Sequence, residues 1–169
     1  MLALGLGVAA LAALLDQLSK LWVLRYFGEA GCASHMVPVT SFFDFILTCN
    51  RGVSFGMFNQ PGEPALGFWI FSVIATIVVI ALVVWLFRVR SALLAVAIGL
   101  IIGGAIGNVI DRLRLGGVVD FLYFHAGAWY WPAFNLADSA ICLGVAAMLL
   151  DGTLLRRVGQ AKGREDLPS

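Results

Sequence analysis

Charge is what this sequence has least of. Only 12% of its 169 residues are Asp, Glu, Lys or Arg, and 61% are hydrophobic. Soluble domains typically carry about 25% charged residues, so the composition excludes an ordinary soluble fold and indicates an integral membrane protein. The 11 basic and 10 acidic residues nearly balance. This balance argues against nucleic acid as a partner, because binding phosphates requires an excess of basic residues.

Histidine and cysteine are also few, with two His and three Cys. His125 has no second His or Cys at a spacing typical of metal ligands, so we assign no metal and no cofactor. A Ser or Cys nucleophile is disfavoured, since His125 is the only plausible base. Cys142 lies in an apolar run. Cys32 and Cys49 fall in one predicted outer loop, where a disulfide between them is an open alternative.

Long apolar runs dominate what is present. They cover residues 2–27, 65–87, 92–110 and 135–155, and each is near or above the roughly 20 residues that cross a bilayer as a helix. The first run lacks a basic segment before it and contains Asp16 and Lys20, so we interpret it as a retained helix and not as a cleaved signal peptide. With no linker or tandem repeat, residues 1–169 are predicted to form one membrane domain.

Basic residues predict the orientation of these four helices. Arg88 and Arg90 lie in the short loop between the second and third helices, and the tail 156–169 adds four more basic residues. Because cytoplasmic loops are enriched in Lys and Arg, both termini are predicted to be cytoplasmic. The count is six basic residues on this side against five on the other. The loops 28–64 and 113–134 then lie outside.

The two outer loops contain short runs rich in Val, Phe, Ile, Thr and aromatic residues. We predict strands over 36–40, 42–49, 118–124 and 128–131, with a hairpin turn at 125–127. The expected fold is therefore four transmembrane helices with a small extracytoplasmic antiparallel sheet. A short interfacial helix is expected over 52–59, and Trp129, Tyr130 and Trp131 are expected at the depth of the lipid headgroups.

Two aspartates stand out in this apolar context. Asp120 is flanked by Val118, Val119 and Phe121, and Asp138 follows the apolar stretch 134–137. A carboxylate at the edge of hydrocarbon is costly, so it indicates function. Two neighbouring carboxylates tend to share one proton, and such a pair can activate water while polarising a carbonyl, as in aspartic proteases. A glycosidase also uses two carboxylates, but nothing here indicates a sugar-binding cleft.

Other polar residues fall near the same predicted membrane surface. Asp16 and Lys20 are four apart on one helical face and can pair. Gly104, Asn108 and Asp111 form a polar stripe that ends at Arg112, and Asn135 lies three residues before Asp138. Because they gather at one end of the helices, they predict a site at one interface and not a path across the bilayer.

Simpler interpretations exist for each residue. Asp120 could cap a turn, Asp138 could interact with the amino end of its helix, and Asp16 with Lys20 could be a structural pair. Asp111 and Arg112 could be a pair at a helix end. The glycines at 99, 103 and 107 form GxxxG patterns that most simply mean close helix packing.

The rival class of function is a non-enzymatic carrier or scaffold, but a carrier is expected to place ionisable groups near the bilayer midplane.

Five sequence blocks taken together resemble the bacterial lipoprotein signal peptidases, also called signal peptidase II. They are 16–20 (DQLSK), 50–56 (NRGVSFG), 103–112 (GGAIGNVIDR), 118–121 (VVDF) and 134–139 (FNLADS). Each block alone is weak, but the five occur in the family's order on the four-helix pattern. The resemblance implies an aspartic endopeptidase of the inner membrane. Its substrates are diacylglyceryl-modified prolipoproteins, which are cleaved just before the lipidated cysteine, and its inhibitor is globomycin.

The resemblance also assigns roles to residues. It implies that Asp120 and Asp138 are catalytic, whereas the residue pattern alone does not exclude Asp111 from the acidic pair. Pocket or supporting roles are implied for Asn50, Gly52, Asn108, Asp111, Arg112, Asn135, Asp16 and Lys20. Phe55, Met57 and Phe58 are expected in a lid over the substrate.

Overall fold

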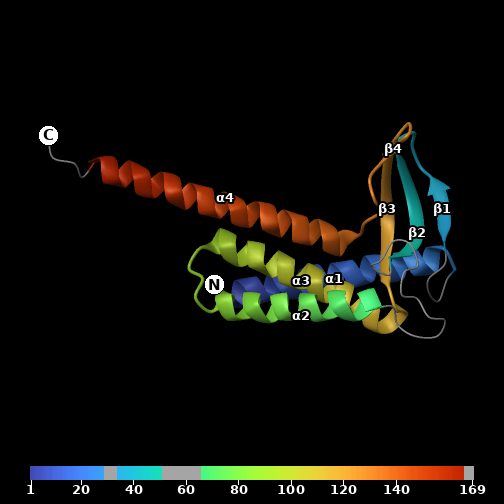
Figure 1. The fold of residues 1–169 in the computed structure, drawn as a ribbon, viewed down its shortest axis with the longest axis horizontal. Helices are drawn as coiled ribbons and strands as arrows, with labels where there is room; N and C mark the ends of the chain where they lie inside the picture. The colour runs from blue at the N-terminus through green and yellow to red at the C-terminus, as the bar shows by residue number, and fades with distance from the viewer. Residues whose placement is uncertain (29–33, 51–65, 166–169) are drawn as a thin grey trace.

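Four helices form a bundle, and a small sheet stands at one end of it (Figure 1). The computed structural model describes residues 1–28, 34–50 and 66–165, with side chains described for 1–28, 34–50 and 69–152. The helices are α1 (Leu2–Tyr26), α2 (Leu66–Leu86), α3 (Ala92–Leu115) and α4 (Leu136–Glu165). Cys32, Gly52, the predicted interfacial helix and the predicted lid lie outside the described residues.

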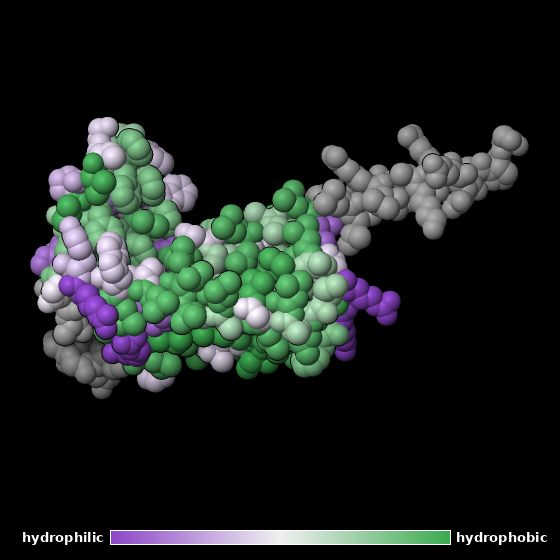
Figure 2. Space-filling model, turned by 180° about the vertical axis from the view of Figure 1, so that it is seen from behind, coloured by the Kyte–Doolittle hydropathy of each residue, from purple (hydrophilic) through white to green (hydrophobic). Residues whose placement is uncertain are grey.

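The surface of the bundle is apolar along most of its length. Trp69, Ile77 and Ile80 of α2 are more than half exposed, and Figure 2 shows a broad hydrophobic surface over the helices. Such a surface is stable only in lipid, where helices satisfy all their own backbone hydrogen bonds. Among the described residues, three helices are long and apolar enough to cross a membrane, over Leu2–Tyr26, Trp69–Leu86 and Ala92–Leu115. The chain is therefore a membrane protein, and the fourth span remains a prediction.

Helix α3 is the central helix and packs closely through glycine. A Cβ atom at Gly99 or Gly103 would collide with a backbone carbonyl oxygen of α1, and one at Gly104 would collide with the carbonyl oxygen of Ala137 in α4. Lipid offers no hydrophobic force between helices, so association relies on this kind of close backbone contact. The packing role predicted for the GxxxG pattern is confirmed.

The sheet is antiparallel throughout, in the order β1-β2-β3-β4. Its strands are β1 (His35–Pro38), β2 (Phe43–Asn50), β3 (Val118–Ala126) and β4 (Trp129–Tyr130). One face packs on the last turns of α1, where Val23 and Leu24 meet Leu47, Val119 and Phe121. This core fixes β3 beside the ends of the helices. The small sheet predicted from sequence is confirmed.

Three predicted boundaries are wrong. Helix α3 continues past residue 110 to Leu115, because Gly116, with a φ of 71°, is the first residue to adopt the left-handed conformation that ends a helix. Helix α4 continues through most of the predicted tail to Glu165, since that segment is rich in good helix formers and has no proline before residue 168. His125 and Ala126 belong to β3, and Gly127, with a φ of 59°, begins the turn.

The sequence also makes predictions for the aromatic residues at the end of the sheet and for the cysteines. Trp129, Tyr130 and Trp131 are exposed, and their predicted depth at the headgroups remains a prediction. Cys49 in β2 is disulfide-bonded. The sequence had left open whether this cysteine forms a disulfide. Cys142 is free.

The packing of α3 on α1 predicts a large difference between two glycine-to-alanine changes. Gly103→Ala should lower the stability of the protein by about 1–3 kcal/mol, because the new methyl group meets the carbonyl oxygen of Ala9. Gly7→Ala on α1 is the matched control, since a Cβ atom added at Gly7 would meet nothing within 4 Å. Thermal unfolding in detergent measures both, and equal melting temperatures would contradict the packing argument.

Candidate active site

Asp120 is buried inside β3, directly opposite Thr48 of β2. Its Oδ1 accepts a hydrogen bond of 2.7 Å from Nδ2 of Asn135, and the Asn50 side chain also hydrogen-bonds to its carboxylate. A residue in the interior of a strand caps no turn. The interpretation of Asp120 as a turn cap is therefore wrong. The strand instead holds a carboxylate in a fixed place at the end of the bundle.

Asp138 lies in the first turn of α4, where it takes part in the helix cap. The backbone N–H of Asp138 donates to Oδ1 of Asn135 over 2.9 Å, and the backbone N–H of Asn135 donates to Oδ2 of Asp138 over 3.3 Å. This reciprocal pair is a capping box with Asp in place of the usual Glu or Gln. Asp138 thus does interact with the amino end of its helix, as one interpretation of the sequence expected. Its other oxygen, Oδ1, accepts a bond of 2.8 Å from Nδ2 of Asn108.

Asn135 joins the two aspartates. It is fully buried, and its side chain bonds to the Asp120 carboxylate through Nδ2 and to the first turn of α4 through Oδ1. The pKa of Asp120 rises from 3.8 to about 7, mainly because burial disfavours its charge and also because the charge of Asp138 repels it. The bonds from Asn135 and Asn50 act in the opposite direction. Asp120 therefore exchanges a proton near neutral pH.

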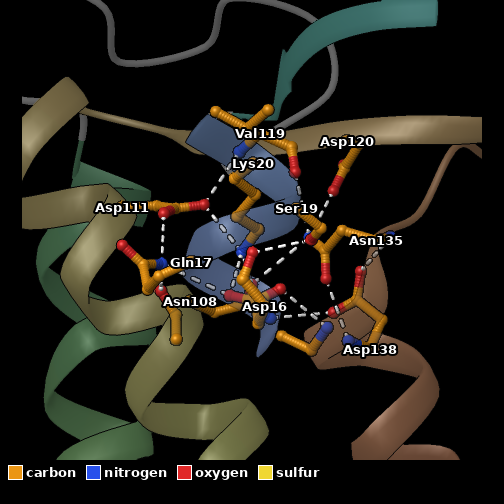
Figure 3. A network of polar contacts seen from close by, with 12 residues as sticks. Asp16, Gln17, Ser19, Lys20, Asn108, Asp111, Val119, Asp120, Asn135 and Asp138 are labelled. Atoms are coloured by element: carbon orange, nitrogen blue, oxygen red, sulfur yellow. Dashed lines mark hydrogen bonds and ion pairs between the residues drawn. The ribbon is translucent and has the colours of Figure 1, made fainter. Parts of the chain in front are cut away.

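A buried ammonium group lies beside this pair (Figure 3). Nζ of Lys20 is 2.8 Å from Oδ2 of Asp16 and 2.7 Å from Oδ2 of Asp111, and it donates to Oδ1 of Asn108 over 3.0 Å. The three charged side chains are at most 3% exposed. The predicted pair of Asp16 and Lys20 is present, with Asp111 as a second anionic partner.

Both of these supporting carboxylates also hold the backbone of segments that contain the aspartate pair. Oδ1 of Asp16 accepts from the N–H of Ala137 over 2.9 Å, next to Asp138. Oδ2 of Asp111 accepts from the N–H of Val119 over 3.2 Å, next to Asp120. Asp111 is therefore engaged with Lys20 and β3, which separates it from the pair formed by Asp120 and Asp138.

Gln17 is a member of this network that sequence reasoning missed. Its Nε2 donates to Oδ1 of Asp111 over 2.9 Å and to the carbonyl oxygen of Gly107 over 3.1 Å. A Cβ atom at Gly107 would collide with Oδ2 of Asp16, so that glycine leaves room for the carboxylate. The one available signal was the position of Gln17 inside the block 16–20.

An apolar groove approaches the site from the bundle. It has a volume of about 250 Å³ and is lined by Phe71, Ile74, Ala75, Val78, Ile101, Ala105, Asn108, Arg112 and Ile141 of α2, α3 and α4. Its polar end is made by Asn108, which bonds to Asp138, and by Arg112. The Arg112 guanidinium donates to the carbonyl oxygen of Asn108 over 3.2 Å and lies 5.8 Å from the Phe71 ring centre. The groove thus includes Asn108, which is one hydrogen bond away from the carboxylate of Asp138.

The structure brings together eight of the ten residues singled out in sequence. Asp16, Lys20, Asn108, Asp111, Asp120, Asn135 and Asp138 form one connected network, and Asn50 contacts Asp120. Arg112 lies at the edge of this network in the groove, and Gly52 lies outside the described residues. Among the described residues, no group of three or more His, Cys, Asp or Glu could hold a metal ion.

The fold and the site together define a helical membrane protein with a carboxylate-rich site at one end of its bundle. The family described as Signal peptidase (SPase) II matches residues 8–154 of the chain. Curated lipoprotein signal peptidases are similar: that of Methylorubrum extorquens strain PA1 is 49% identical over 145 residues, 85% of this chain and 82% of the relative. That of Nitrobacter hamburgensis is 49% identical over 154 residues, 87% of this chain and 90% of the relative.

A solved structure agrees with these relatives. It is a bacterial membrane enzyme determined by the in meso method at 2.3 Å resolution, with a TM-score of 0.67, 28% identity and coverage of 92% of this chain and 90% of that chain. The chain belongs to the signal peptidase II family and is therefore a membrane peptidase.

The contacts of Asp16 predict a mainly structural effect of its neutralisation. Asp16→Asn should lower stability by about 2 kcal/mol, because it removes one anionic partner of buried Lys20 and weakens the acceptor for the Ala137 N–H. Thermal unfolding and membrane yield measure this, with Arg25→Gln at an exposed position of the last turn of α1 as control. An inactive Asp16→Asn protein of unchanged stability would indicate a direct role in chemistry.

Proposed function

We propose that this protein is an aspartic endopeptidase that removes the signal peptide from diacylglyceryl-modified prolipoproteins. Cleavage occurs just before the lipidated cysteine, and Asp120 and Asp138 activate water. The observation that carries the proposal is that Asn135 bonds both carboxylates: its side-chain Nδ2 donates to Asp120, and its backbone N–H donates to Asp138. The names of the curated relatives supply the substrate class.

The two carboxylates differ in a way that suits acid-base catalysis. Asp120, whose pKa is about 7, carries the shared proton. Asp138 acts as the base and accepts a proton from water as the water oxygen attacks the scissile carbonyl carbon. Asp120 meanwhile donates a hydrogen bond to the carbonyl oxygen. The proton on Asp138 then passes to the leaving amine of the cysteine, which releases the signal peptide and restores the pair.

The apolar groove between α2, α3 and α4 supports an apolar substrate segment. A signal peptide that lies along it brings its polar end to Asn108 and Arg112, beside Asp138. An amide can both donate to and accept from an extended peptide, so Asn50 and Asn108 hold the substrate backbone, and Gly52 allows its close approach. Anchoring enzyme and substrate in one membrane raises their effective concentration.

The membrane arrangement follows from the same proposal. Helix α4 is the fourth span, and residues 1–169 form one peptidase domain of the bacterial inner membrane. Both termini are cytoplasmic, so the sheet and the aspartate pair lie at the periplasmic face. Globomycin, a cyclic peptide, inhibits by occupying the substrate site.

Neutralising Asp120 tests the assignment directly. Asp120→Asn keeps the size of the side chain but removes the shared proton, so turnover should fall by about 10³-fold or more, within the range of general acid-base effects. The assay uses purified protein in detergent with a synthetic lipobox peptide that carries a diacylglyceryl-cysteine. Retained globomycin binding is the control for folding. Near-normal cleavage by this variant would refute the proposed mechanism.

The raised pKa of Asp120 predicts a basic limit to activity. An acid with a pKa of about 7 holds its proton below that pH and loses it above. Because the mechanism needs protonated Asp120, kcat/KM should fall as pH rises through about 7, approaching tenfold per pH unit. A series of initial rates from pH 5 to pH 9 measures this limb. A rate that stays constant to pH 9 would contradict the assignment of the proton to Asp120.

A further inference from the structure

We infer that Lys20 is a positioning residue that fixes the orientation of the Asn108 amide and so aims an N–H donor at Asp138. The inference rests on the proposed function, because it specifies how the side chain of the proposed base is held. The amide of Asn108 lies between Lys20 and Asp138 in the hydrogen-bond network, with one end bonded to each of them (Figure 3).

The chemistry of the donors and acceptors allows only one orientation of this amide. An ammonium group donates and cannot accept, whereas an ionised carboxylate accepts and cannot donate. Oδ1 of Asn108 must therefore face Nζ of Lys20, at 3.0 Å, and Nδ2 must face Oδ1 of Asp138, at 2.8 Å. Lys20 has no spare hydrogen for another task, because its other two bonds go to Asp16 and Asp111.

Without Lys20, little would hold the amide in place. The other donor to Oδ1 of Asn108 is Nδ2 of Asn135, at 3.3 Å. That nitrogen has only two hydrogens, and closer acceptors compete for them, namely Asp120 at 2.7 Å and the carbonyl oxygen of Val119 at 3.2 Å. A turned amide would present its oxygen to Asp138, and that arrangement favours the protonated carboxyl group over the ionised one.

The charge of Lys20 also acts through space, since it lowers the pKa of Asp120, but its field is partly offset. Asp16 and Asp111 flank its ammonium group at 2.8 and 2.7 Å and offset its field at greater distances. The other charged groups that interact with this region are Asp120 of β3, which repels the anion of Asp138, and Arg112 of α3, which attracts it. Both remain in place when Lys20 is replaced, but Asp16 and Asp111 lose their counter-charge, so a variant that changes no charge has to accompany the replacement of Lys20.

The experiment compares Lys20→Met with Ser19→Ala in the full-length protein. Ser19 neighbours Lys20 on α1, but its Oγ donates only to the carbonyl oxygen of Asp16 in the same helix. With the diacylglyceryl-cysteine peptide, Lys20→Met should lower kcat by up to about tenfold at pH values on the acidic limb and change KM less than about threefold. The acidic limb of its kcat/KM profile should move up by about one pH unit, while Ser19→Ala keeps the original profile.

A second variant tests the inference even if Lys20→Met fails to fold. Asn108→Leu removes the N–H donor to Asp138 without adding charge, while Lys20 keeps both anionic partners, so it should reproduce the upward movement of the acidic limb. An unchanged limb in Asn108→Leu, or an equal loss at every pH in folded Lys20→Met, would overturn the role of Lys20. Asp120→Asn in the same assay separates the two ideas: if it is inactive the proposed function stands, and if it cleaves normally the proposed function itself fails.

Discussion

The buried ion group formed by Lys20, Asp16 and Asp111 is the interaction on which the rest of the site depends. Burying an ammonium group is costly unless all its hydrogens find acceptors, and here each one does. The two carboxylates also accept hydrogen bonds from the N–H groups of Ala137 and Val119. One ion group on α1 and α3 thereby locates both the first turn of α4 and the start of β3. The sheet and the fourth helix meet there because the same charges hold both.

Structural roles and proposed chemical roles coincide at the start of α4. Asn135 caps the helix and also donates to Asp120, and Asp138 completes the capping box while its other oxygen faces Asn108. A capping interpretation and a functional interpretation are therefore not alternatives for these residues. The cap restricts the positions of both side chains, and a restricted carboxylate needs less reorganisation during reaction. Removing Asn135 would disturb the helix end and the aspartate pair together.

Sequence alone predicted the parts of this fold that depend on composition and local pattern. Long apolar runs located the helices, and carboxylates in apolar surroundings located Asp120 and Asp138. The end of α3 was missed because its last turn is polar. Polar residues end an apolar run but do not end a helix, and α3 ends at Gly116. Gln17 was missed because its partners, Asp111 and Gly107, are distant in sequence. Such contacts depend on helix packing, which one sequence does not display.

The secondary structure around the aspartates explains how two identical side chains can take different parts in the proposed reaction. Asp120 lies in a strand, buried, without a helix end to favour its negative charge. Asp138 lies in the first turn of α4, where the helix dipole and the N–H of Asn135 favour an anion. In the proposed reaction, the strand therefore supplies the acid, Asp120, and the helix end supplies the base, Asp138.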